Sequence, residues 1–499
     1  MSESDEPLPL RHLVLHFDLN KTILTRDPYD HIDSTEIFLC DTICRMAWGE
    51  VTFTDEEQQK DEELDEQQRA DKYLAATWTL KSEDLTQDSP EESLISYRQY
   101  LDICHPFKRP ENDEEFQDQT ERNKKILDFL SDQGSIFKKQ YDILHEKMKL
   151  PADAKVDENI TGDFKQAYDV GRFNIIPGFF KTLKALSDQK RSFSLAFRTH
   201  GRELRNVIDE FNNFCEGKHP AYNGHSGEQI FFNGTKSRDL RIKDRQTGMY
   251  FRFGRELSDV NLIMNSLERI QCNNMDDLLD GYGRQIEEGT VAHYSDSIEE
   301  NYMVIMDTLK KYGSLALHDD FYAYYLNKDD NDFGKLFLVD QTDFTTQHIF
   351  FDDMAVEGPT SNIDIRDIST MEKVPERKFR DKYVVRANIY EAIKDEDYFL
   401  KTIAKCERAR DREIERLQDG ILSSEDEEEE IPEDKWETLQ NLPNEEYLVK
   451  TIAPLLYQGL NFISTERPTN PIEFLALYML QNKHLVDIPK PQVPEAEGE

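Results

Sequence analysis

The sequence has few cysteines and no long apolar run. Its 499 residues include 6 cysteines, none of them in a Cys-x-x-Cys pair, so we expect neither a disulfide framework nor a zinc module. No apolar stretch approaches the roughly 18 residues that a bilayer-spanning helix requires. The first ten residues, MSESDEPLPL, are acidic, which is untypical of a signal peptide. These absences predict a soluble, cytoplasmic protein in a reducing compartment.

Positive charge is also scarce. The chain has 61 Lys and Arg against 101 Asp and Glu, which gives a formal net charge of -40 at pH 7. This excess disfavours direct binding to nucleic acid or to an anionic membrane, because both carry phosphate charge. A basic partner, Mg²⁺ or a role in solubility alone is a better explanation of the negative charge.

The order of apolar and amphipathic segments predicts an α/β fold. Four short apolar runs are typical of buried strands: HLVLHF at 12–17, FSLAF at 193–197, GKLFLVD at 334–340 and QHIFFDD at 347–353. The segment IIPGFFKTLKAL at 175–186 predicts a helix ahead of the second run. Helices that alternate with strands in this way predict a mostly parallel sheet.

Two long stretches interrupt this pattern. Residues 34–150 carry many charges with apolar residues at helical spacing, which predicts a mostly helical module. Between residues 201 and 335, HSGEQIFFNGTKSRDLRIKDRQTGMYFRF predicts β hairpins and SDVNLIMNSLERI predicts a helix. We therefore expect two insertions in the α/β core.

Polar side chains stand at the ends of the predicted strands. Asp18 and Thr199 follow the first two strands, Lys335 precedes the third, and Asp352 and Asp353 close the fourth. Each has an ordinary explanation, such as an aspartate that caps a helix. Together they supply a nucleophile, a hydroxyl, an ammonium and further carboxylates, which is the set that metal-assisted phosphoryl transfer through an aspartyl-phosphate needs. The sequence therefore predicts a phosphoryl-transfer site at one sheet edge.

These motifs resemble those of the haloacid dehalogenase superfamily. FDLNKT at 17–22 resembles its first motif, FSLAFRT at 193–199 its second, Lys335 its third and FFDD at 350–353 its fourth. The resemblance implies a Rossmann-like core in which Asp18 is the nucleophile. It also implies that the Thr199 hydroxyl donates a hydrogen bond to phosphate and that Lys335 stabilises both nucleophile and phosphate.

The same resemblance implies a Mg²⁺ site and cap domains. Asp18, Asp352, Asp353 and the backbone carbonyl of Asn20 would hold the ion. The two insertions fall where this superfamily carries caps. The implied activity is a Mg²⁺-dependent phosphohydrolase whose substrate the sequence does not identify.

Asn20 departs from the superfamily pattern. Phosphatases of the family have an acid there that protonates the leaving group and later activates water, and an amide cannot titrate. Three interpretations stay open: a slow phosphatase, a phosphotransferase or phosphoprotein-like switch, or a binding site without turnover. Arg198 and His200, which flank the second motif, are candidates to replace the acid or to contact phosphate.

The C-terminal region predicts a helical hairpin that needs a partner. Apolar residues recur at three- and four-residue intervals up to residue 463, and RPTNP at 467–471 then ends the first helix and caps a second. Two such helices cannot bury this much apolar surface alone, so we expect a homodimer. The expected dimerisation and partner-binding residues are Leu448, Ile452, Leu455, Leu456, Leu460, Ile472, Leu475 and Met479.

This hairpin resembles the Dpy-thirty (dumpy-thirty) dimerisation motif, most specifically in IAPLLYQGL and RPTNPIEFLALYMLQN. The resemblance implies a four-helix bundle of two chains with a groove for an amphipathic helix of a scaffold protein. Such motifs occur in histone lysine methyltransferase complexes and in radial spoke and other ciliary proteins. By analogy we expect a cilium or axoneme setting, with a nuclear chromatin complex as the alternative.

The predicted organisation follows from these segments. The alternative to a tethered, slow phosphohydrolase is an inactive scaffold or interaction protein with the same fold. The predicted parts are a core at 10–30, 171–205 and 313–404, a helical cap at 31–170, a second insertion at 206–312, an acidic helix and linker at 405–440, the dimerisation motif at 441–487 and a tail at 488–499.

Overall fold

The computed structural model divides the chain into two compact units, Met1–Gln418 and Asp419–Glu499. The residues it describes are 11–53, 64–106, 119–267, 272, 274–288, 293–295, 297–327, 330–356 and 361–418, with Leu456, Leu460, Ile472 and Leu475. Within these residues, no helix combines the length and apolarity needed to cross a membrane.

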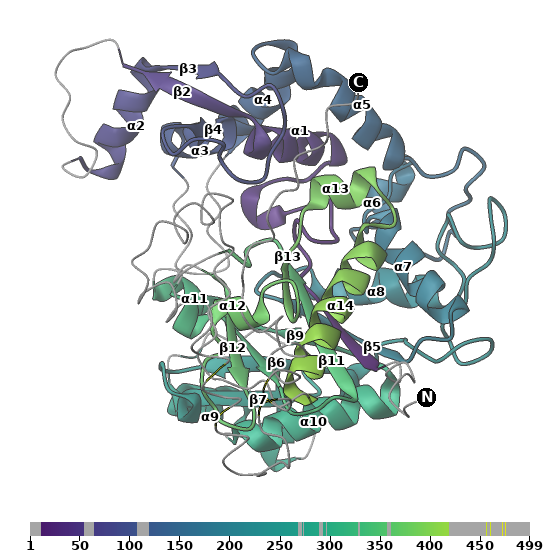
Figure 1. Ribbon diagram of the computed structural model, residues 1–499. Helices are drawn as coiled ribbons and strands as arrows, with labels where there is room; N and C mark the ends of the chain where they lie inside the picture. The colour runs from purple at the N-terminus through teal and green to yellow at the C-terminus, as the bar shows by residue number, and fades with distance from the viewer. Residues whose placement is uncertain are drawn as a thin grey trace. The chain divides into compact units, whose positions relative to one another are not determined.

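An eight-stranded sheet lies at the centre of the first unit, with the strand order β13-β11-β1-β5-β9-β6-β7-β8 (Figure 1). The six strands from β13 to β6 run parallel, and β7 is antiparallel to both of its neighbours. The strands are β1 His12–Phe17, β5 Phe193–Thr199, β6 Thr247–Arg252, β7 Val260–Met264, β8 His293–Ser295, β9 Ser314–His318, β11 Thr346–Asp352 and β13 Val384–Arg386. The predicted α/β fold with a mostly parallel sheet is confirmed.

Helices cover both faces of this sheet. On β1, the side chains of Leu13, Leu15 and Phe17 pack in the larger core, whereas Val14 packs in the core on the other face. Burial on both faces explains why the strands read as nearly continuous apolar runs. The larger core contains residues of α7 Pro177–Asp188, α8 Leu204–Cys215, α13 Ile389–Lys394 and α14 Tyr398–Gln418, and the other core contains residues of α10 Ile298–Tyr312.

Strand β10, Lys335–Val339, lies outside the main sheet. It pairs in parallel with β12, Ile363–Asp367, in a separate two-stranded sheet. Leu336 and Leu338 pack in the core that contains α10, whereas Phe337 and Val339 pack in another core beside β12. The expectation that GKLFLVD joins the same sheet as QHIFFDD is therefore wrong. A buried apolar run predicts a strand but does not predict which strand it pairs with.

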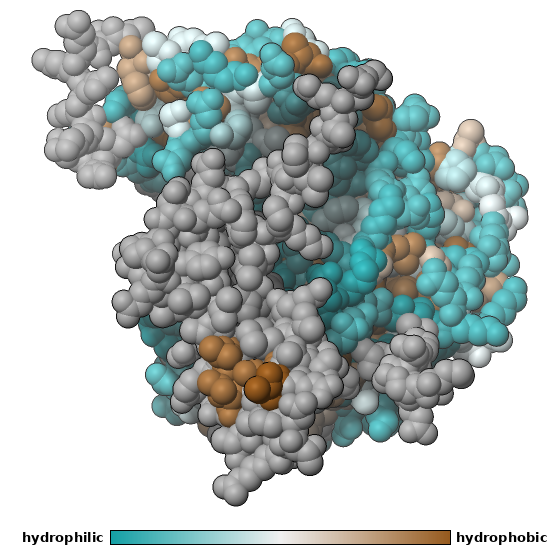
Figure 2. Space-filling view, viewed as in Figure 1, coloured by the Kyte–Doolittle hydropathy of each residue, from teal (hydrophilic) through white to brown (hydrophobic). Residues whose placement is uncertain are grey.

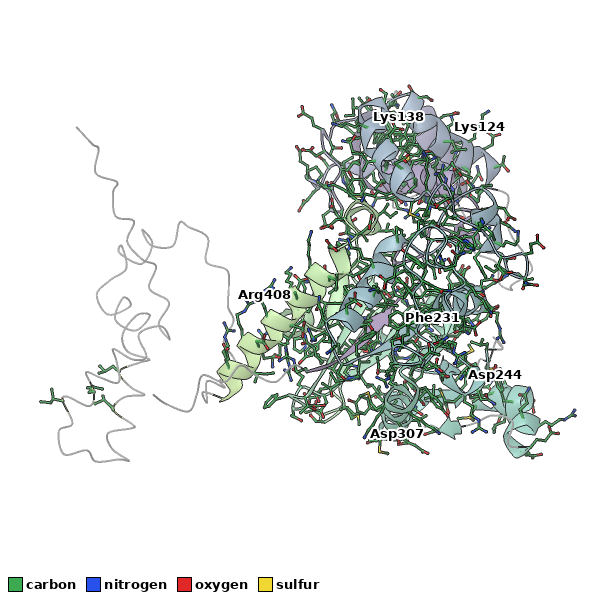
Figure 3. All side chains as sticks on the ribbon, turned by 90° about the vertical axis from the view of Figure 1, so that its right-hand side faces the viewer. Lys124, Lys138, Phe231, Asp244, Asp307 and Arg408 are labelled. Atoms are coloured by element: carbon green, nitrogen blue, oxygen red, sulfur yellow. The ribbon has the colours of Figure 1, made fainter. Side chains whose placement is uncertain are left out.

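The first insertion adds a small sheet to its helices. β2 pairs antiparallel with β3 and β4, so the mostly helical prediction missed three short strands. Its elements are α1 Thr35–Met46, β2 Trp48–Thr52, α2 Glu66–Ala75, β3 Thr77–Leu80, β4 Ile95–Ser96, α3 Tyr97–Cys104, α4 Thr120–Asp128, α5 Lys138–Lys147 and α6 Lys165–Asp169. Figure 3 marks α4 and α5 by Lys124 and Lys138, and the helix α10 by Asp307.

The long stretch between residues 201 and 335 contributes strands to the main sheet. Residues 225–246 contain no strand, and the hairpin forms only from β6 and β7. The predicted helix at SDVNLIMNSLERI is wrong over Val260–Met264, which is the fully buried strand β7. A short apolar run is compatible with either a helix or a buried strand. Here the run pairs antiparallel with β6 and is a strand. The remaining helices are α9 Met275–Glu287, α11 Phe321–Leu326 and α12 Glu376–Phe379.

Helix α14 runs without a break from Tyr398 to Gln418, across the predicted boundary after residue 404. Phe399, Ile403 and Cys406 on this helix are buried in the larger core. Hydrophilic side chains predominate on the described surface in the view of Figure 2, as the excess of charged residues requires. The predicted linker beyond residue 418 and the tail at 488–499 lie outside the described residues.

Candidate functional site

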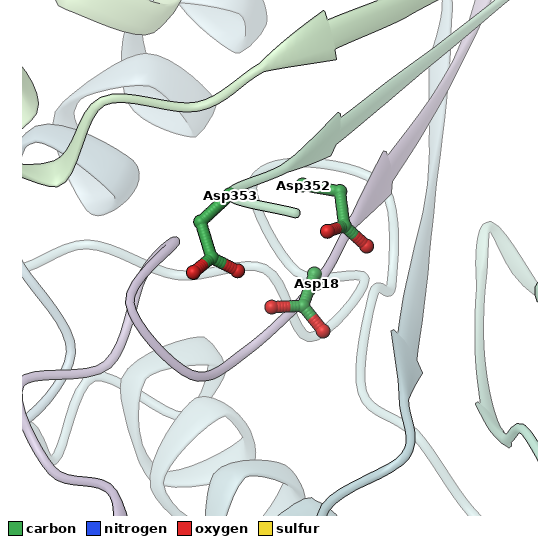
Figure 4. Close-up of side chains that lie close together, drawn as sticks. All are labelled: Asp18, Asp352 and Asp353. Carbon is green, nitrogen blue, oxygen red and sulfur yellow. The ribbon is translucent and has the colours of Figure 1, made fainter. Parts of the chain in front are cut away.

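Three carboxylates meet at the carboxyl edge of the sheet. The neighbouring parallel strands β1 and β11 end together, with Phe17 paired to Phe351. Asp18 follows β1, while Asp352 ends β11 and Asp353 follows it. One ligand oxygen from each of the three lies within 4.8 Å of the others (Figure 4). Asp18 and Asp352 are buried, so their charges need compensation.

Lys335 provides that compensation. Its Nζ donates to Asp18 Oδ1 at 2.6 Å and to Asp352 Oδ2 at 2.7 Å. The lysine is itself buried and starts β10, so the separate two-stranded sheet delivers an ammonium to the edge formed by β1 and β11. Paired, hydrogen-bonded charges are the form in which ions persist in a protein interior.

Burial and neighbouring charges shift the pKa values of the cluster. Burial raises the pKa of the Asp18 carboxyl well above its usual value, and Asp352 and Asp353 raise it further while Lys335 opposes them. Burial and the neighbouring Asp352 raise the pKa of Asp353 to about 6. Burial by itself would lower the pKa of Lys335, but the Asp18 and Asp352 charges outweigh it and raise that pKa. The ammonium therefore stays charged.

Thr22 belongs to the site although it was not among the predicted site residues. Its Oγ1 donates to Asp18 Oδ2 at 3.2 Å and accepts from the Asp353 backbone N–H at 3.2 Å. A tight turn after β1 places it there, with Lys21 in the left-handed region at φ 56° and the Leu19 carbonyl accepting from residues 22 to 24. The sequence feature that could have identified Thr22 is its position at the end of the FDLNKT motif.

Thr199 and Asn20 lie at the border of the cluster. Thr199 ends β5, the other neighbour of β1, and its Oγ1 accepts from the Gly201 N–H at 2.8 Å. The Asn20 side-chain amide donates to the Arg26 carbonyl at 3.3 Å. A methyl group placed on Gly201 would have the Asn20 Oδ1 at 2.8 Å and the Thr199 Oγ1 at 3.1 Å. The structure thus brings both predicted residues to one side of the site.

The two residues that flank the second motif are held by other contacts. The Arg198 guanidinium is buried and donates to Asp319 Oδ2 at 3.0 Å and to the Leu336 carbonyl at 2.9 Å. The His200 ring stacks on Tyr324 with centroids 5.1 Å apart. Arg198 therefore serves the buried framework, and its charge is already matched by Asp319.

The donor set fits Mg²⁺. Hard divalent cations take carboxylate and carbonyl oxygens, and the carboxylates that would hold the ion are those of Asp18, Asp352 and Asp353. A contribution from the main-chain carbonyl of Asn20 stays a prediction. The raised pKa values of Asp18 and Asp353 reflect burial and unneutralised negative charge, which a cation would relieve.

Comparison with known proteins concerns the other end of the chain. A family model described as the Dpy-30 motif matches residues 443–484. The chain carries a C-terminal Dpy-30 motif. The Set1 complex component sdc1 of Schizosaccharomyces pombe is 30% identical over 66 residues, which are 11% of this chain and 61% of that protein. The chain thus spans less than two thirds of this relative, and the motif contains none of the carboxylate cluster.

Four residues of the predicted dimerisation face are described. Leu456, Leu460, Ile472 and Leu475 are all helical, and the residues Leu460 and Ile472 are 49% and 81% exposed. Large apolar side chains this exposed on a docking motif are suited to burial by a partner. The other predicted residues of this face, Leu448, Ile452, Leu455 and Met479, lie outside the described residues.

Mg²⁺ should raise the melting temperature of the protein at pH 7.5 and raise it less at pH 5. Below a pKa of about 6, Asp353 carries a proton that the ion must displace. Asp352→Asn should remove most of the rise, whereas Asp142→Asn, on the exposed side of α5, should keep it. Differential scanning fluorimetry at constant ionic strength measures these shifts. Equal shifts in the two variants would contradict the assignment of the site.

Proposed function

We propose that this chain is a docking protein that ties a Mg²⁺-dependent phosphoryl-transfer site to a larger assembly. The Dpy-30 match supports the docking role. The contact of Lys335 with both Asp18 and Asp352 supports the phosphoryl-transfer role. The α/β core is in this proposal haloacid-dehalogenase-like, with the residues of its four motifs at one sheet edge.

The docking part acts as a homodimer. Two copies of the C-terminal hairpin form a four-helix bundle, and its groove binds an amphipathic helix of a scaffold protein. The Set1 complex component from fission yeast favours a chromatin assembly in the nucleus. The ciliary, radial-spoke-like setting expected from the sequence has no support from the comparisons.

The catalytic part uses Asp18 as the nucleophile. Its carboxylate attacks the phosphorus of a phosphate monoester, the bond from phosphorus to the leaving oxygen breaks, and an aspartyl-phosphate forms. Water then cleaves this acyl-phosphate to release phosphate and restore Asp18. The Lys335 ammonium and the Thr199 hydroxyl stabilise the charge on the phosphoryl oxygens. Mg²⁺, when bound, supplies further charge neutralisation and orients the phosphate.

A second candidate is an interaction protein whose α/β domain does not turn over. Asn20 favours it, because an amide at this position cannot exchange a proton with a leaving group or with water. The comparisons also support docking more directly than catalysis, since the matched segment at 443–484 lies far in sequence from Asp18 and Lys335. The two candidates differ only in chemistry at Asp18.

An aryl phosphate with Mg²⁺ should be hydrolysed by the purified full-length chain. Asp18→Asn should abolish turnover, because the nucleophile is lost while the side-chain volume is nearly unchanged. Asn20→Asp restores the acid of the superfamily and should be at least as active as the natural chain. Absence of Mg²⁺-dependent hydrolysis in both the natural chain and Asn20→Asp would exclude the phosphohydrolase.

Light scattering should give a mass near twice 58.6 kDa for the full chain. Removal of all residues after 440 should leave a monomer. Leu460→Glu should weaken the dimer because it places a charge on the apolar face. Leu74→Glu, at a leucine of similar exposure on α2, is the matched control and should leave the dimer intact. An unchanged mass after truncation would contradict the dimerisation.

A further inference from the structure

We propose that Glu203 performs the acid and base work that Asn20 cannot perform. This inference rests on the proposed phosphohydrolase function and adds a catalytic residue to it. Glu203 lies four residues beyond Thr199, in the segment between β5 and α8.

The position of Glu203 turns its carboxylate toward the site. The residue occupies the N-cap position of α8, but its side chain makes no capping hydrogen bond to that helix. The side chain is nevertheless buried, with 8% of the residue exposed. Glutamate is seldom buried in proteins unless it has a partner, so contacts outside the helix cap hold this side chain in place.

Gly201 shows where the carboxylate lies. A methyl group placed on this glycine would have three nearest atoms: Glu203 Oε2, Asn20 Oδ1 at 2.8 Å and Thr199 Oγ1 at 3.1 Å. The carboxylate, the amide and the threonine hydroxyl therefore surround one small space. That space borders both the residue expected to contact phosphate and the residue that replaces the acid of the superfamily.

Glu203 can act first as an acid and then as a base within one turnover. When Asp18 attacks phosphorus, the protonated Glu203 carboxyl donates its proton to the leaving oxygen as the phosphorus–oxygen bond breaks. In the second half, the Glu203 carboxylate takes a proton from the water that attacks the aspartyl-phosphate. The proton lost in the first half is regained in the second, so the cycle closes.

Three other charged residues near the site already have assigned roles. The Lys335 ammonium is bonded to two carboxylates, and the Arg198 guanidinium is paired with Asp319. Asp353 belongs to the carboxylate cluster that suits a cation. Glu203 is a carboxylate near Asn20, among the described residues, that lies outside this cluster.

Glu203→Gln tests the proposal in the full-length chain with an aryl phosphate and Mg²⁺. We expect kcat to fall about 10²- to 10⁴-fold, the usual contribution of a general acid or base. We also expect the aspartyl-phosphate to accumulate in acid-quenched samples. Adding Asn20→Asp to this variant should restore turnover, because the new aspartate supplies the missing acid. If Glu203 had only a structural role, the added aspartate would not restore turnover. Glu216→Gln, at the opposite end of α8 and paired with Lys218, is the matched control.

A second variant guards against misfolding of the first. Gly201→Ala keeps Glu203 but places a methyl group where its carboxylate lies, so kcat should fall while the melting temperature changes little. The role of Glu203 is overturned if the natural chain is active and Glu203→Gln matches Glu216→Gln in kcat. Inactivity of both the natural chain and Asn20→Asp would overturn the proposed function itself, and the role of Glu203 with it.

Discussion

The structure of the site depends on one buried ammonium. Lys335 bonds to Asp18 and to Asp352, which end neighbouring strands of the main sheet. Without this charge, two buried carboxylates would face each other with Asp353 beside them, and loss of one partner of a buried pair is strongly destabilising. Strand β10 lies between two cores outside the main sheet and brings Lys335 to an edge that it does not itself extend.

Further charge pairs connect this site to the first insertion. Lys21, in the turn after β1, lies 3.0 Å from the Asp30 carboxylate. Asp30 also pairs with Arg45 of α1, Arg98 of α3 and Arg122 of α4. Burial opposes the ionisation of Asp30, but these cations hold its pKa well below the usual value. These ion pairs therefore join the first insertion to the turn that contains Asn20 and Thr22.

The sequence was sufficient for the parts of the fold that local pattern determines. Strand β1 and the edge position of Asp18 and Asp352 followed from apolar runs that end in acids, and α7 followed from its Pro-Gly start and apolar spacing. The sequence did not predict the place of β10 or the strand at Val260–Met264, because each depends on pairing with another strand. Glu203 was missed for the same reason: only the folded chain brings its carboxylate to Asn20.

The claim that Asp18 accepts a phosphoryl group can be tested without any substrate. Beryllofluoride mimics a phosphoryl group on a carboxylate, and fluorine NMR distinguishes bound from free species. With Mg²⁺ present, the natural chain should give bound resonances that are absent for Asp18→Asn and retained for Glu203→Gln. Free resonances alone in the natural chain, at any Mg²⁺ concentration, would contradict the account and leave the α/β domain as a docking scaffold.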